Sequence, residues 1–142
     1  GGGGLIAGVS TALLSKFPNL PIYAVEPENY NDTKLSLEQN KIVEVDVTKK
    51  SICDALLAPK PGEITFNINK NNLAGALLVS DQEAMLAMKT AFEYLKVVLE
   101  PGGAVALAAA IMHKIDIENK NVLIVASGGN VDKEVFEKSL SV

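Results

Sequence analysis

Apolar residues along this chain fall into two kinds of run, which predict strands and helices. Short continuous runs bounded by Gly, Pro or Asn predict four buried strands, at 21–26, 42–45, 76–79 and 121–126. Longer stretches with apolar positions on one helical face predict helices at 5–16, 34–39, 63–73, 81–98 and 131–140, and an alanine-rich helix that ends near 114. Continuous apolar strands separated by helices are typical of a buried parallel sheet. The pattern therefore predicts an α/β fold of three layers, a parallel sheet with helices on both faces.

Three loops of this predicted fold stand out as candidate ligand sites. Ligands of such sheets lie at the carboxyl ends of the strands. The first loop is the glycine run at 1–4, the second follows Glu26, and the third is the turn that begins at Ser127. A capping box at Ser80 and Glu83 predicts that one of the long helices begins between these loops, at Asp81.

The stretch Gly1–Gly8 reads GGGGLIAG and has the composition of an anion site. Four glycines leave the backbone N–H groups unshielded, and the helix that follows places the positive end of its dipole beside them. Phosphate loops normally follow a strand, so we expect that residues preceding Gly1 are missing from this chain. The alternative reading of a glycine run at a chain start is a cloning linker.

Composition excludes several classes of function. Hydrophobic residues make up 48% and charged residues 21% of the 142 positions, as in ordinary globular proteins. The net charge is −4 and the 13 basic residues are all lysine, so no nucleic acid is expected as a partner. The single cysteine, Cys53, excludes an intrachain disulfide and is expected to be a small buried apolar residue. The absence of a long apolar run or a basic leader favours a cytoplasmic protein that has no membrane partner.

Three motifs, taken in order, resemble one enzyme family. They are GGGGLIAG at 1–8, EPGGA at 100–104 and SGGNVD at 127–132. Together they are similar to the fold-type II pyridoxal-phosphate enzymes, and within these to the serine/threonine dehydratases and serine racemases. The resemblance runs over nearly the whole chain. It implies that residues 1–142 form part of the large, cofactor-binding domain, in the C-terminal part of such an enzyme.

The resemblance implies roles for seven residues around the cofactor, pyridoxal 5′-phosphate. Gly1, Gly2, Gly3 and Gly4 would bind its phosphate through their amides. Ser127, followed by Gly128, would face the pyridine nitrogen, and Glu100 would lie close to the ring. Gly102 and Gly103 would let backbone approach the cofactor. Without the resemblance, Ser127 is a turn serine and Glu100 an acid placed favourably at a helix N-terminus.

A metal site is a second implication. Relatives bind Mg²⁺ or Ca²⁺ with a glutamate, a backbone carbonyl four residues later and an aspartate two residues beyond it. Those positions here are Glu26, Tyr30 and Asp32. Hard cations prefer oxygen ligands of these kinds. The family often has a small residue where this chain has Tyr30. The alternative is a helix N-cap at Asn31 or Asp32, with Glu26 in solvent.

The lysine that forms the Schiff base with the cofactor is absent from the expected context. In the family it lies in a Ser-x-Lys-x-Arg motif upstream of the glycine loop, and this chain has no arginine. We therefore assign no catalytic residue and expect these 142 residues to be inactive alone. The intact enzyme is expected to be a homodimer or larger oligomer that dehydrates L-serine or L-threonine. The alternatives are a serine racemase, a 3-hydroxyaspartate dehydratase, and a non-catalytic phosphate- or nucleotide-binding module.

Overall fold

A two-stranded parallel sheet lies at the centre of the chain, with helices on both sides. The computed structural model describes all of residues 1–142. Strand β1 (Tyr23–Pro27) pairs in parallel with β2 (Gly75–Val79), in a register that aligns Tyr23 with Gly75 and Pro27 with Val79. Both carboxyl ends therefore meet at one edge, beside Pro27 and Val79.

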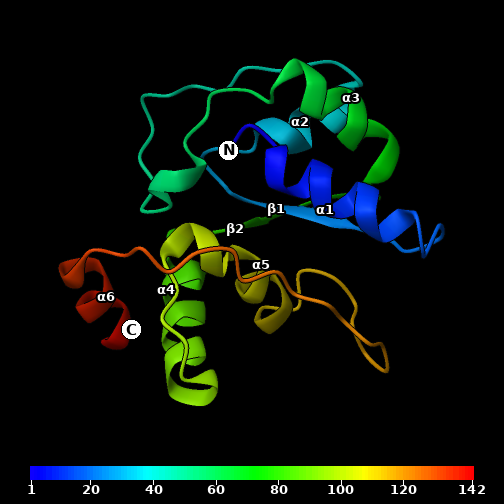
Figure 1. Ribbon diagram of the computed structural model, residues 1–142. Coiled ribbons are helices and arrows are strands. Elements are labelled where there is room, and N and C mark those ends of the chain that lie inside the picture. Colours follow the sequence, from blue (N-terminus) through cyan, green and yellow to red (C-terminus); the bar gives the residue numbers. More distant parts are fainter.

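The helices form a layer on each face of this sheet (Figure 1). On one side lie α1 (Gly4–Leu14), α2 (Asp32–Gln39) and α3 (Glu63–Asn72). On the other side lie α4 (Asp81–Thr90), α5 (Pro101–Ile111) and α6 (Lys133–Leu140). Two short elements complete the fold, the 3-10 turn η1 (Asp54–Leu56) and the π-helical turn η2 (Ala91–Leu95). Because α2 and α5 pack against the strands from opposite sides, the predicted α/β arrangement of three layers is confirmed.

The apolar core lies between the sheet, α4 and α5. Alanines at 84, 87, 104 and 108 are fully buried where the two helices cross, so their backbones approach closely. Met88 and Val79 fill the space that these small side chains leave. The predicted capping box fixes the start of α4, since Ser80 Oγ accepts the N–H of Glu83 and Glu83 Oε2 accepts the N–H of Ser80. None of the helices has the length and apolarity needed to cross a bilayer.

The strand predicted at 42–45 is wrong. This segment forms no ladder. Its N–H groups donate outside the sheet, that of Val45 to the carbonyl of Pro59 at 2.8 Å and that of Val43 to Ser36 Oγ at 2.9 Å. Asp46 and Thr48 turn the chain directly afterwards. Lys41 before the run and Glu44 within it lie in solvent, so the segment lacks the apolar packing that a strand of the sheet needs.

The strand predicted at 121–126 is also wrong as a hydrogen-bonded element. The segment forms no ladder, and Val122, Leu123 and Val125 are exposed. The reason is the absence of a neighbour: β1 pairs only with β2, and no strand lies beside residues 121–126. A parallel strand is stabilised by its partners, so an apolar β-prone run alone cannot form one.

The helix predicted at 81–98 ends earlier than the periodicity indicates. Regular α-helix stops at Thr90, η2 continues to Leu95, and Lys96 then adopts a left-handed conformation with φ 58°. A left-handed residue is a common way to end a helix. The early end releases residues 97–100, which carry Glu100 to the start of α5. The alanine-rich helix likewise ends at Ile111 rather than near 114.

Cys53 is 1% exposed and packs in the core, as the sequence predicts. Burial is the main cause that raises the pKa of its thiol to about 11, so the reactive thiolate is scarce near neutral pH. We expect less than about one tenth of Cys53 to react with a thiol reagent at about pH 8 in the native protein, and complete reaction after denaturation. Mass spectrometry of the Cys53 peptide measures both. Rapid labelling of the native protein would show that this part of the core opens.

Candidate functional site

The glycine loop, defined as residues 1–4, turns its carbonyl oxygens toward α3. Gly3 is the N-cap of α1 and has a left-handed backbone with φ 83°. The carbonyl of Gly2 accepts hydrogen bonds from the N–H of Gly62, at 3.1 Å, and from the hydroxyl of Thr65. The carbonyl of Gly3 accepts one from Asn69 Nδ2 at 3.3 Å. A side chain on Gly3 would meet Asn69 at 2.8 Å, so glycine is required there.

The amide side of the loop is free. The N–H groups of Gly2 and Gly3 donate to no atom of the chain, and α1 leaves the first N–H groups from Gly4 onward without partners inside the helix. A Cβ built on Gly4 would meet nothing within 4 Å. Free amides at a helix N-terminus, with open space before them, are an anion site. This geometry fits the phosphate of pyridoxal phosphate, the group that the motif implies.

The turn η1 joins the glycine loop to the start of α5. A side chain on Gly1 would lie 3.3 Å from the carbonyl oxygen of Ala55, and one on Gly102 would lie 3.2 Å from Leu56. The segment 54–56 therefore touches the glycine loop and the N-terminus of α5. Contacts through one short turn bring two motifs about a hundred residues apart in the sequence to one end of the molecule.

The turn 127–130 is held against the start of α5 by Glu100. The N–H of Glu100 donates to the carbonyl of Gly128 at 3.0 Å, and Glu100 Oε2 accepts the N–H of Asn130 at 3.2 Å. A side chain on Gly128 would lie 2.5 Å from Glu100 Oε1, so this glycine makes room for the carboxylate. Glu100 thus fixes the turn that presents Ser127. Glu100 is the N-cap of α5 and lies beside the Ser127 turn. This position fits both interpretations of Glu100, an acid at a helix N-terminus and a residue close to the cofactor ring.

The two glycines that follow Pro101 are packed closely by other parts of the chain. A Cβ on Gly103 would lie 2.8 Å from the backbone nitrogen of Gly128 and collide with that residue's carbonyl. A Cβ on Gly102 would press against Leu56. Their lack of side chains lets the turn 127–130 and η1 pack closely on α5.

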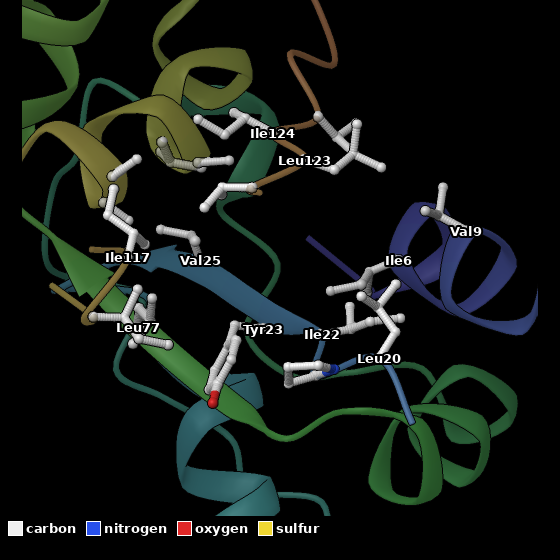
Figure 2. A pocket seen from close by; sticks show the side chains of 18 of the residues that line it. Ile6, Val9, Leu20, Ile22, Tyr23, Val25, Leu77, Ile117, Leu123 and Ile124 are labelled. Carbon is white, nitrogen blue, oxygen red and sulfur yellow. The ribbon is translucent and has the colours of Figure 1, made fainter. Parts of the chain in front are cut away.

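Ser127 is exposed and its hydroxyl makes no hydrogen bond within the chain, so it is free to bind a ligand. It borders an open apolar groove of about 520 Å³ between α1, β1, α5 and the segment 115–127. Figure 2 shows the labelled side chains of Ile6, Val25 and Ile124 pointing into this groove from α1, β1 and the segment 115–127. The groove therefore adjoins the free edge of β1 on one side and the unpaired segment 121–126 on the other.

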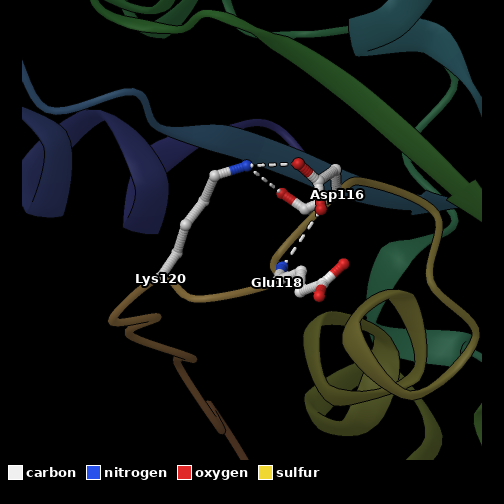
Figure 3. A network of polar contacts seen from close by, with 3 residues as sticks. All are labelled: Asp116, Glu118 and Lys120. Atoms are coloured by element: carbon white, nitrogen blue, oxygen red, sulfur yellow. Dashed lines mark hydrogen bonds and ion pairs between the residues drawn. The ribbon is translucent and has the colours of Figure 1, made fainter.

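A polar turn contributes Asp116 and Lys120 to the lining of this groove, and Figure 3 shows its contacts. Lys120 Nζ lies 2.7 Å from Asp116 Oδ2 and also donates to the carbonyl of Asp116, while the N–H of Glu118 donates to Asp116 Oδ1 at 3.0 Å. These contacts organise the loop that leaves α5. All three side chains are in solvent, so the turn positions residues 121–126 without forming a buried ionic site.

The three residues of the predicted metal site lie together where β1 ends and α2 begins. Glu26, Tyr30 and Asp32 are at most 5% exposed. The carboxylate of Glu26 accepts the N–H groups of Thr33 and Lys34, each at 2.8 Å. Glu26 is thus buried at the N-terminus of α2. The alternative interpretation, a helix N-cap with Glu26 in solvent, required an exposed side chain. Burial is the main cause that raises the pKa of Glu26.

Asp32 is the residue of this cluster whose buried charge has no partner in the chain. Both of its carboxylate oxygens are buried and have no hydrogen-bond partner. Burial, and then the nearby charge of Glu26, raise the pKa of Asp32 to about 7. The carbonyl oxygen of Tyr30 also accepts no hydrogen bond, while its hydroxyl points away to the carbonyl oxygens of Val47 and Lys49. Two buried carboxylates and a free carbonyl are a donor set that fits Mg²⁺ or Ca²⁺.

Sequence reasoning did not single out Thr65 and Asn69, which hold the glycine loop. One signal was present. Residues 63–72 form a helix although they contain four asparagines, which disfavour helix. Asn69 binds Gly3, and Asn72 Nδ2 donates to Ser10 Oγ at 3.0 Å. Asparagine has a low helix propensity, so four of them in one helix indicated that α3 makes specific polar contacts.

Known relatives share both the sequence and the fold. The chain is 40% identical over 141 residues to a serine racemase of Schizosaccharomyces pombe, and 39% identical over 141 residues to an L-threo-3-hydroxyaspartate ammonia-lyase of Saccharomyces cerevisiae. Each match covers 99% of this chain and 43% of the relative. The crystal structure of a T.th. threonine deaminase superposes with a TM-score of 0.87 at 36% identity, over 93% of this chain and 48% of that one. The chain thus spans less than half the length of these relatives.

The family comparison covers most of the chain. The profile of a family described as pyridoxal-phosphate dependent enzyme matches residues 1–128, a range that contains the glycine loop, Glu100 and Ser127. The fold of the solved relatives contains the same α/β arrangement. With a matching profile over most of its length, the chain belongs to the pyridoxal-phosphate-dependent enzymes.

Proposed function

We propose that the full-length enzyme containing this chain is an ammonia-lyase that acts on L-serine or L-threonine. It would eliminate water across the Cα–Cβ bond, and the released enamine would take up water and lose ammonia to give a 2-oxo acid. The observation that carries this proposal is the pairing of the amide cradle of the glycine loop with the free hydroxyl of Ser127. The names of the relatives, two of which are deaminases or ammonia-lyases, support the same class.

In this proposal the chain's own residues bind and orient the cofactor. The N–H groups of the glycine loop hold the phosphate, and the Ser127 hydroxyl faces the pyridine nitrogen. A hydroxyl is a far weaker acid than a carboxylic acid, so it leaves that nitrogen largely unprotonated. When bound, pyridoxal phosphate withdraws electrons from the substrate's α-carbon and stabilises the negative charge left by loss of a proton. A moderate electron sink favours expulsion of the β-hydroxyl over return of the proton.

The lysine that binds the cofactor covalently would come from outside these 142 residues. No lysine here lies in a Ser-x-Lys-x-Arg context. The relatives have more than half of their length beyond the match, which is room for that lysine and for the groups that bind the substrate carboxylate. We propose that a β-prone strand of the same polypeptide also fills the apolar groove, pairing with the free edge of β1 and with residues 121–126.

We further propose that Glu26, Asp32 and the carbonyl of Tyr30 bind Mg²⁺ or Ca²⁺. The two partnerless oxygens of Asp32 support this.

A homodimer or larger oligomer is proposed because apolar side chains, among them Tyr94 and Leu95, lie 78% and 62% exposed on η2. The free cysteine is consistent with a reducing, cytoplasmic location.

Product analysis of the full-length protein tests the function. The protein would be saturated with pyridoxal phosphate and supplied separately with L-serine, L-threonine and L-threo-3-hydroxyaspartate, and 2-oxo acid and ammonia would be measured. We expect both products in equal amounts from serine or threonine. D-serine as the main product would favour the racemase, which the 40% identical relative makes the second candidate. No conversion of any substrate would contradict the proposal.

A further inference from the structure

Three donors from residues 62–69 converge on the two carbonyl oxygens of the glycine loop. The N–H of Gly62 and the hydroxyl of Thr65 point to the oxygen of Gly2, and Asn69 Nδ2 donates to the oxygen of Gly3. Thr65 Oγ1 also lies 3.0 Å from the carbonyl oxygen of Gly62, so its hydroxyl sits between the two chain segments. None of these residues belongs to the three sequence motifs.

The direction of the carbonyls determines the direction of the amides. In a trans peptide the C=O and the following N–H point opposite ways, and the chain contains no cis peptide. Holding the oxygen of Gly2 against α3 therefore turns the N–H of Gly3 away from α3. Holding the oxygen of Gly3 does the same for the N–H of Gly4. Both N–H groups then face the open side of the loop, where a Cβ on Gly4 would have only its own helix turn within 4 Å.

A run of four glycines cannot hold this orientation alone. Glycine has the largest backbone freedom of any residue, so each peptide plane of the loop can rotate at little steric cost. The left-handed Gly3, φ 83°, is one of several conformations open to it. Part of the order comes from α1, since the N–H of Ala7 donates to the oxygen of Gly3 at 3.1 Å. The donors of residues 62–69 supply the rest, and they alone hold the oxygen of Gly2. Asn72, which donates to Ser10 Oγ and Thr11 Oγ1, keeps α3 fixed against α1.

We propose that Thr65 and Asn69 are positioning residues for the cofactor phosphate: they clamp the carbonyls of Gly2 and Gly3 and so aim the amides of Gly3 and Gly4 at the anion. This inference rests on the proposed phosphate site. It adds that the affinity for the phosphate depends on residues that do not touch it, about sixty positions away in the sequence.

Substitution of Thr65 in the full-length enzyme tests the clamp. Thr65→Val removes the hydroxyl and keeps the shape, and Thr65→Ser keeps the hydroxyl. Thr90→Val is the matched control, since Thr90 also donates its hydroxyl to a carbonyl, that of Leu86 at 2.8 Å, in a helix on the other side of the sheet. The dissociation constant for pyridoxal phosphate, the melting temperature and the pH dependence of the ³¹P chemical shift of the bound phosphate would be measured for each.

We expect Thr65→Val to raise the dissociation constant about tenfold, because misaimed amides lose charge-assisted bonds to the phosphate. The pKa of the phosphate bound to this variant should lie nearer to the pKa of the free ester, since fewer aligned amides stabilise the dianion. Thr65→Ser and Thr90→Val should behave as the wild type in both readouts. A wild-type affinity and ³¹P profile in Thr65→Val would overturn the clamp and leave the phosphate site standing. A wild type that binds no pyridoxal phosphate would instead contradict the proposed function.

Discussion

Replacing Gly4 by alanine is expected to weaken pyridoxal phosphate binding at least about tenfold without destabilising the protein. In a helix the Cα–Cβ bond tilts toward the N-terminus, so a methyl group on Gly4 projects in front of the glycine loop. Apart from its own helix turn, a Cβ there meets nothing within 4 Å, so the fold does not need glycine at this position. The methyl group would occupy the space in which the phosphate approaches the amides, and each lost charge-assisted bond costs about 1.5–3 kcal/mol.

Gly8→Ala is the matched control for this prediction. Gly8 lies one turn further along α1, is exposed, and also has nothing within 4 Å of a built Cβ. Both variants make the same chemical change in one helix, and alanine favours helix over glycine by up to about 1 kcal/mol. We expect equal or higher melting temperatures in both, with weaker cofactor binding in Gly4→Ala alone. Equal affinities of the two variants for pyridoxal phosphate, measured by equilibrium dialysis, would show that the phosphate lies elsewhere.

Removing the charge of Asp32 is expected to abolish stabilisation by divalent cations. Millimolar Mg²⁺ or Ca²⁺ should raise the melting temperature of the wild type at about pH 8, because the cation supplies a partner for two buried carboxylate oxygens that have none. Asp32→Asn should lose that response. Glu38→Gln is the control, since it removes one negative charge from the exposed side of the same helix, where Glu38 pairs with Lys34. A cation response that survives in Asp32→Asn would contradict the metal site.

The same residue predicts how the metal-free protein responds to pH. The pKa of Asp32 rises from 3.8 to about 7 in the folded state, so the folded protein binds this proton more tightly than the unfolded chain. Its contribution to stability is therefore full below about pH 4 and is lost as the pH rises to about 7. Cation binding competes with the proton, so stabilisation by metal should grow over the same range. In metal-free buffer Asp32→Asn should be at least as stable as the wild type at about pH 8, which thermal unfolding of the two proteins would measure.

Local signals predicted most of the fold because they depend on nearby residues. The capping box at Ser80 fixed the start of α4, and glycine or proline punctuation bounded β1 and β2 closely. Pairing does not depend on nearby residues alone. The run at 121–126 has every local property of a strand, yet forms none because no neighbouring strand lies beside it. The end of α4 was misjudged because the left-handed Lys96 has no sequence signal comparable to a glycine.

The candidate site shows the same division between local and distant information. Gly1–Gly4, Glu100 and Ser127 lie in motifs and were named from the sequence. Their support was not, because it comes from contacts between distant segments: Thr65 and Asn69 on the glycine loop, and η1 between that loop and α5. The protein contact of Gly103 was missed for a related reason. Its missing side chain indicates a close approach, but the sequence does not say that the approaching group is Gly128.

A crystal structure of the full-length protein with pyridoxal phosphate tests the central claim most directly. We predict phosphate oxygens within hydrogen-bonding distance, roughly 2.7–3.2 Å, of the backbone nitrogens of Gly3 and Gly4, and the Ser127 hydroxyl at the same distance from the pyridine nitrogen. A phosphate bound away from the glycine loop, or a ring nitrogen that faces a group other than Ser127, would contradict it.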